Sequence, residues 1–330
     1  MSRLYDVEDA IFKVMSEISI DKSSGNVGDN ITMTGNRFAA NEGGIKILFD
    51  GKAVVMEISA DEQGEWEESF EVPEMPTGKY SISAEGEQTR KEELGELSFE
   101  IEPNIMLSPI EGHVGMNLTV TGRGFAANED VNITYDGSQL ATAETNDKGS
   151  FNVTFSVPGS KHGERLVTAG YAGGNAANAM FTMESDPPPM PELISPHDGS
   201  RIGLRGEVTP TFEWSEVSDV SGVQYSLQIA TNENFTDTGG FADPLVSVTG
   251  LVETSYTLDE TEALSLGTYY WIVQATDGAE NEGKWSAPRS FRIGLLPLWG
   301  LITIIAVGVV LLVLLIRALV RRRSIYYDRW

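Results

Sequence analysis

A stretch of sixteen residues occurs twice in this chain, and this repeat constrains the fold more than any other feature. Residues 27–42 and 114–129, which lie 87 positions apart, share the elements Val-Gly, Thr-x-Thr-Gly and Phe-Ala-Ala-Asn-Glu. Asp-Gly and Val-Pro pairs follow at matching places in both copies. A period of about 85 residues is that of a whole domain rather than of a solenoid unit. The chain therefore contains two consecutive domains of one kind.

Apolar and polar residues alternate within each copy. Val131, Ile133 and Tyr135 follow this pattern in the second copy, and Tyr80 and Ile82 follow it in the first. A period of two with β-branched and aromatic residues indicates half-buried strands. Asp-Gly turns punctuate these strands at short intervals. We therefore predict an all-β chain of tandem immunoglobulin-like sandwiches.

The repeated motif resembles that of IPT/TIG domains, which are immunoglobulin-like folds of surface and adhesive proteins. The likeness covers residues 18–102 and 103–184, and the second copy has the fuller motif, Thr121-Gly122-Arg123-Gly124-Phe125. The first copy departs from it with Asn36-Arg37 before Phe38, where the family has a glycine. The resemblance implies a fold rather than a ligand, and we expect Phe38 and Phe125 in the cores. The loops 36–45 and 123–131 are candidate contact surfaces.

The N-terminal residues 1–17 are open to two interpretations. Ala10–Val14 resembles the strand Leu97–Ile101 that ends the first copy, which suggests the end of a preceding repeat. The spacing of Leu4, Val7 and Ile11 instead fits a short amphipathic helix. Residues 1–20 lack the basic region followed by an apolar core that marks a signal peptide. We therefore expect a longer exported protein that extends beyond residue 1.

A proline-rich linker, residues 185–192, leads to a third domain at residues 193–293. Its ordered motifs resemble those of a fibronectin type III domain, with Trp214 in an early strand and Tyr269 or Tyr270 near the tyrosine corner. We expect Trp214, Tyr225 and Trp271 in its core.

Residues 295–316 form an apolar run without a charge, and Arg317, Arg321, Arg322 and Arg323 follow it. A helix of about 22 residues is roughly 33 Å long, enough to cross a hydrocarbon core of about 30 Å. The arginines favour a cytoplasmic tail, residues 317–330, and an extracellular N-terminal part. We expect one transmembrane helix in the cell membrane.

The net charge and the cysteine content of the chain exclude some partners and some kinds of site. Residues 295–330 hold five of the 23 basic and one of the 49 acidic residues, so the remainder carries 18 against 48, a formal charge of about −30. Residues 1–294 therefore repel nucleic acid, which is excluded as a partner. The chain has no cysteine, so disulfides and thiolate sites are excluded.

The sequence offers few candidates for metal binding, sugar binding or catalysis. The loop Asp277–Gly283 concentrates oxygen ligands, and Asp277, Glu280 and Asn281 are its candidate calcium ligands. Its spacing is not that of an EF-hand, and a hairpin turn is the favoured interpretation. Trp66 suits either sugar stacking or packing. The glycosylation sequons that begin at Asn132 and Asn152 matter only in an organism that glycosylates asparagine, and strand alternation by itself accounts for their occurrence. We expect no cofactor and no catalysis.

These features predict a single-pass cell-surface protein that acts in adhesion, ligand binding or spacing, with an extracellular protein or glycan as partner. One alternative is the non-catalytic anchor of a longer surface hydrolase. Another is a receptor that signals through a partner protein, because the tail of about fourteen residues is too short for a folded output domain.

Overall fold

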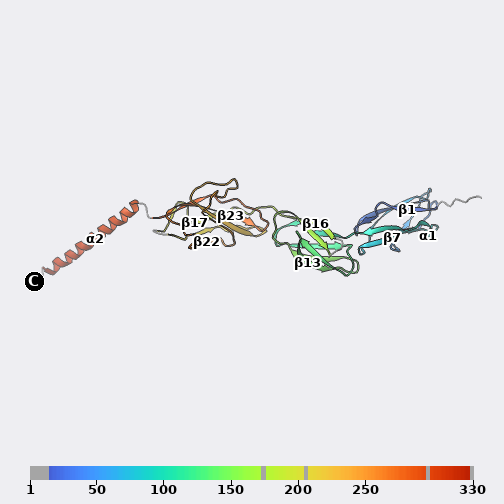
Figure 1. Ribbon diagram of the computed structural model, residues 1–330, viewed down its shortest axis with the longest axis horizontal. Helices are drawn as coiled ribbons and strands as arrows, with labels where there is room; N and C mark the ends of the chain where they lie inside the picture. Colours follow the sequence, from blue (N-terminus) through green and yellow to red (C-terminus); the bar gives the residue numbers. More distant parts are fainter. Residues whose placement is uncertain (1–14, 172–175, 204–206, 295–297, 328–330) are drawn as a thin grey trace, which may run out of the picture. The chain divides into compact units, whose positions relative to one another are not determined.

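The computed structural model describes residues 15–171, 176–203, 207–294 and 298–327, with side chains of the last segment for 305–319 only. The chain divides into two compact units. The first comprises Met1–Pro158 and Gly163–Glu184, and the second comprises Gly159–His162 and Ser185–Trp330. The strands build three two-sheet sandwiches, two in the first unit and one in the second (Figure 1). The predicted all-β, immunoglobulin-like fold is confirmed. The proposed strand at residues 10–14 lies outside the described residues.

The three sandwiches share one topology, a sheet of three strands facing a sheet of five. In each, the first strand lies in the smaller sheet, and a short second strand pairs in parallel with the last strand of the larger sheet. The other strand pairs are antiparallel. Both IPT/TIG-like copies and the third domain are therefore variations of one sandwich.

The strands of the first sandwich are, in spatial order, β1 (Glu17–Ile20), β3 (Asn30–Asn36) and β6 (Trp66–Glu71), and then β2 (Ser24–Gly25), β8 (Leu97–Ile101), β7 (Gly78–Glu85), β4 (Ile45–Phe49) and β5 (Lys52–Ile58). A four-residue helix, α1 (Lys91–Leu94), precedes β8. The strands of the second sandwich are β14 (Phe151–Ser156), β11 (Asn117–Arg123) and β9 (Asn104–Ser108), and then β10 (Glu111–Gly112), β16 (Ala176–Met183), β15 (Gly163–Gly170), β12 (Asp130–Tyr135) and β13 (Ser138–Glu144).

The strands of the third sandwich are β17 (Leu193–Ser195), β19 (Thr211–Trp214) and β22 (Ser255–Thr257), and then β18 (Ser200–Ile202), β24 (Arg289–Ile293), β23 (Gly267–Asp277), β20 (Val223–Ala230) and β21 (Val246–Leu251). The last element is the helix α2 (Leu298–Tyr327). No helix among the residues that the structure describes is long and apolar enough to cross a membrane.

The glycine of the repeated Thr-Gly motif makes room for an aromatic ring. A Cβ on Gly122 would overlap the ring of Phe151 from the neighbouring strand β14, and one on Gly35 would overlap Trp66 from β6. The motif phenylalanines pack on the same rings, with centroids 5.3 Å apart for Phe125 and Phe151. The motif therefore encodes a tight aromatic contact inside each core.

Two tyrosines tie strands to the preceding loops. The Tyr269 hydroxyl donates to the carbonyl of Ser265 at 3.0 Å, which identifies Tyr269 rather than Tyr270 as the tyrosine corner. The first sandwich has the same device, since the Tyr80 hydroxyl donates to the Pro76 carbonyl at 2.8 Å.

The larger sheet of each sandwich ends in a strand with an irregular register. The pairs β4–β5, β12–β13 and β20–β21 each contain a register shift, and Glu57 in β5 has a positive φ of 65°. These irregularities bend and twist the outermost strand of each sheet.

Direct bonds join the two sandwiches of the first unit. The Thr77 N–H donates to the Phe125 carbonyl at 3.0 Å. The Glu74 carboxylate accepts from the Ser150 hydroxyl at 2.8 Å and from the Lys148 ammonium at 3.1 Å. These two donors hold the pKa of Glu74 below its ordinary value.

Candidate functional site

The acidic loop that follows β23 is organised by the carboxylate of Asp277. Asp277 is 6% exposed, and its Oδ1 accepts the N–H groups of Ala279 at 2.9 Å and Asn281 at 2.8 Å. Its Oδ2 accepts from Asn281 Nδ2 at 2.8 Å. Glu280, between Ala279 and Asn281, is exposed and has a positive φ of 59°. Because both Asp277 oxygens already bind N–H donors of the loop, this geometry is that of a side-chain-stabilised turn.

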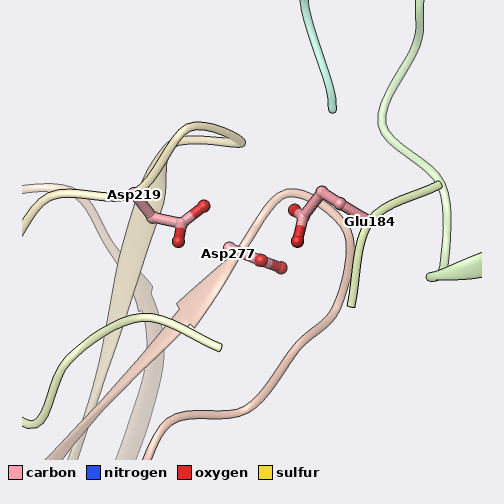
Figure 2. A group of neighbouring side chains, drawn as sticks. All are labelled: Glu184, Asp219 and Asp277. Atoms are coloured by element: carbon pink, nitrogen blue, oxygen red, sulfur yellow. The ribbon is translucent and has the colours of Figure 1, made fainter. Parts of the chain in front are cut away.

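A second carboxylate lies beside Asp277, and the sequence did not indicate it. A carboxylate oxygen of Asp219, in the loop between β19 and β20, lies within 4.8 Å of one of Asp277 (Figure 2). Asp219 Oδ1 accepts the Ser221 N–H at 2.8 Å. The two residues are far apart in sequence and meet only because their loops lie at the same end of the sandwich.

The loop that contains Asp219 also borders a hollow of about 380 Å³ in the third sandwich. The acidic residues Glu216, Asp219 and Glu253 line it together with the buried Tyr225. The Tyr225 hydroxyl accepts the Val217 N–H at 3.0 Å. A hollow with this lining attracts cationic groups and repels anionic ones.

The other predicted site residues lie in cores. Phe38, Phe125, Trp214, Tyr225 and Trp271 are all buried. Trp66 is 6% exposed and packs edge-to-face on Phe38, at a centroid distance of 5.5 Å. Such a buried indole serves packing and leaves no open face for a sugar.

Part of the loop 36–45 is structural, because its Glu42 is fully buried. The Glu42 carboxylate accepts the N–H groups of Thr89 at 2.7 Å and Gln88 at 2.8 Å, and the Thr89 hydroxyl at 2.7 Å. Burial acts to raise the pKa of Glu42, but these hydrogen bonds outweigh it, and the pKa lies below its ordinary value. Glu42 thus fastens the segment before α1 to the 36–45 loop. Its counterpart Glu129 in the loop 123–131 is exposed.

The four arginines expected to set the membrane topology come after the apolar run 295–316. Arg317 lies within α2, and the side chains of Arg321, Arg322 and Arg323 lie outside the described residues.

Comparisons with known proteins support the immunoglobulin-like repeats. Residues 14–98 match the model of the IPT/TIG domain, and residues 201–297 match that of the Rha78A-like, N-terminal immunoglobulin domain. The second match falls on the domain that resembles fibronectin type III in its sequence. No curated protein matches the chain. Each family match covers less than half of the chain.

Solved structures that match this chain have low sequence identity. The fibronectin(III)-like modules of Clostridium thermocellum CbhA are 13% identical, with 58% of this chain and 93% of theirs covered and a TM-score of 0.25. The Yersinia pseudotuberculosis adhesin InvE is 11% identical, with 51% and 58% covered and a TM-score of 0.27. The Bacteroides ovatus SGBP-B, in complex with a mixed-linkage heptasaccharide, is 14% identical, with 84% and 70% covered and a TM-score of 0.20. TM-scores below 0.5 carry no argument about function.

Proposed function

We propose that this chain is a membrane-anchored cell-surface protein whose immunoglobulin-like domains act outside the cell in adhesion and spacing, without catalysing a reaction. The observation that carries the proposal is the exposed apolar surface of α2, which follows the third sandwich. The partner is an extracellular protein or glycan.

The described apolar side chains of α2 are exposed. Those between Ile305 and Leu319 are 44–62% exposed, and the sequence from Leu295 to Ile316 contains no charged residue. Burial of each Leu, Ile or Val side chain contributes about 1.5–3 kcal/mol, so an apolar helix in water forgoes on the order of 20 kcal/mol. The proposed span is the sequence run 295–316, of whose side chains the structure describes only those from Ile305 onward. A lipid bilayer is the environment that recovers this free energy. The arginines from Arg317 onward then favour a cytoplasmic C-terminus.

The contacts within the first unit support a spacing role. The bonds from Thr77 to Phe125, and from Ser150 and Lys148 to Glu74, restrict motion between its two sandwiches. Two domains held in this way act as one spacer rather than as two independent modules. Their acidic surface is also suited to a soluble, exposed part.

A non-catalytic role is supported by how the carboxylates are used. Asp219 and Asp277 lie close together, but Asp277 accepts three hydrogen bonds from its own loop. Glu42 is likewise occupied by Thr89 and Gln88. These groups stabilise loops.

Membrane extraction and surface labelling test the proposal. The full chain should remain with membranes in alkaline carbonate, and a double variant, Val307→Arg with Leu311→Arg, should move to the soluble fraction. Each arginine near the helix centre costs about 2.5–3.5 kcal/mol. The matched control is Val220→Arg, at an exposed valine of the third sandwich, which should stay in the membrane.

An amine reagent that cannot cross membranes should label exposed lysines such as Lys22 on intact cells. Carbonate extraction of the unchanged chain, or unlabelled lysines, would refute the proposal.

A further inference from the structure

The chain contains five Asn-x-Thr sequons, and the structure separates them into two groups. They begin at Asn30, Asn117, Asn132, Asn152 and Asn234. All have threonine at the third position, and none has proline at the second. Such a sequence is the acceptor for N-linked glycans in exported proteins.

Four of the five asparagines present a free amide to solvent. Asn30, Asn117, Asn152 and Asn234 are exposed. Within the described parts of the chain, their side-chain amides make no hydrogen bond. A glycan on any of these nitrogens displaces no contact of the folded protein.

Two of the four occupy equivalent places in the repeats. Asn30 is the first residue of β3, and Asn117 is the first residue of β11. Each follows a turn that contains a glycine with positive φ, Gly28 or Gly115. The chain therefore presents the same acceptor at the same corner of both sandwiches.

Asn234 differs in lying in the loop between β20 and β21 rather than on a strand. Phe235 stacks on Phe241 across this loop at a centroid distance of 5.2 Å, and Asn234 accepts the Ala242 N–H on its carbonyl at 2.8 Å. The loop therefore has a fixed shape that leaves the Asn234 side chain outside it.

Asn132 provides the contrast. It is half-buried, and its Oδ1 accepts from Gln139 Nε2 at 3.0 Å and from the Thr142 hydroxyl at 3.1 Å. A bulky group on this amide disturbs a hydrogen-bonded cluster that joins β12 to β13.

We propose that Asn30, Asn117, Asn152 and Asn234 are N-glycosylated and that Asn132 is not, an inference that rests on the proposed export of these domains. The donor class is a sugar activated as a lipid-linked glycosyl phosphate or pyrophosphate. The asparagine nitrogen forms a bond to the anomeric carbon, the bond from that carbon to the phosphate oxygen breaks, and the lipid phosphate leaves. The amide nitrogen gives up one proton to a base of the transferase.

The threonine hydroxyls indicate when transfer takes place. In the folded protein Thr119 Oγ1 and Thr154 Oγ1, from the Asn117 and Asn152 sequons, lie 2.9 Å apart and form a hydrogen bond with each other. Thr32 Oγ1 similarly lies 3.1 Å from Ser69 Oγ. A transferase that binds the sequon hydroxyl competes with these two hydrogen bonds once the strands have paired. Transfer to Asn30, Asn117 and Asn152 is therefore favoured before the strands pair.

Glycopeptide mass spectrometry of the full chain, isolated from membranes of its own host, tests the inference. We expect hexose-type mass additions on the four asparagines and an unmodified Asn132 peptide. Thr32→Ala should remove the addition on Asn30 alone, whereas Thr32→Ser should retain it. Asn132→Gln should leave the glycan pattern and the electrophoretic mobility unchanged.

Unmodified peptides at all four asparagines, or an addition on Asn132 with none on the others, overturn the inference. Labelling of intact cells with the impermeant amine reagent then separates the two proposals. Labelled lysines with unmodified asparagines leave the surface location intact and reject glycosylation alone, whereas unlabelled lysines reject both.

Discussion

Replacing Gly122 by alanine tests whether the motif glycine is needed because an aromatic ring lies directly against it. Gly122 lies in β11, and a Cβ there would be closer than 3.0 Å to three atoms of the Phe151 ring. That ring cannot retreat easily, because it is buried against Phe125. Gly122 has no positive φ, so alanine suits its backbone and the cost is steric.

Overpacking of this kind costs about 1–3 kcal/mol, whereas the backbone change by itself would stabilise by about 0.4–1 kcal/mol. We therefore expect Gly122→Ala to destabilise the second sandwich by a net ~0.5–2.5 kcal/mol. Hydrogen exchange followed by mass spectrometry measures this locally in β11 and β14, where protection should fall by about tenfold per 1.4 kcal/mol. Gly43→Ala is the control, since no atom lies within 4 Å of its Cβ position.

A double-mutant cycle makes the test specific to the ring. In a Phe151→Leu background, Gly122→Ala should cost at least about 1 kcal/mol less than in the original chain, because the clashing atoms are gone. Unchanged exchange in Gly122→Ala, or additive effects of the two substitutions, would contradict the steric explanation.

Three further outcomes follow from side-chain bonds. Glu42→Gln should lower the free energy of unfolding at neutral pH by about 1–3 kcal/mol. The variant's free energy of unfolding should also fall less steeply as the pH is lowered. The pKa of Glu42 is lowered by folding, so its contribution is present above the ordinary pKa and disappears as the pH falls through the folded-state pKa; urea titrations at neutral and acidic pH measure both effects. Tyr80→Phe should cost about 0.5–1.5 kcal/mol by loss of the bond to Pro76, read from the urea midpoint. Asp277→Ala should destabilise the third sandwich by about 1–3 kcal/mol, and the melting temperature of the unchanged chain should not respond to millimolar calcium or a chelator; a calcium-dependent rise would restore the metal interpretation.

The sandwiches were predictable because their signals are local. Alternation such as Val131, Ile133 and Tyr135 places every second side chain inward whatever the rest of the chain does. The recurrence of Phe38 as Phe125 showed that one pattern is used twice. The reason for the motif glycines was not visible, because Gly122 and Phe151 meet only through the register of β11 with β14.

The polar clusters were beyond prediction for the same reason. Asp277, Glu280 and Asn281 were grouped as neighbours in sequence, whereas the structure uses Asn281 to close a turn with Asp277 and places Asp219 beside them. Glu42 finds its partner in Thr89, 47 residues away. Contacts of this kind depend on which loops share one end of a sandwich, and single-sequence patterns contain no information about that.

The irregular outer strands have a consequence for contacts between copies of this chain. A flat border strand exposes backbone donors and acceptors that can recruit the border of an adjacent copy, which is how sheets grow into aggregates. The register shifts in β4–β5, β12–β13 and β20–β21 distort that template in all three domains, and Lys52 places a charge at the start of β5. Adjacent copies can thus come into contact and separate without pairing their edge strands into one continuous sheet.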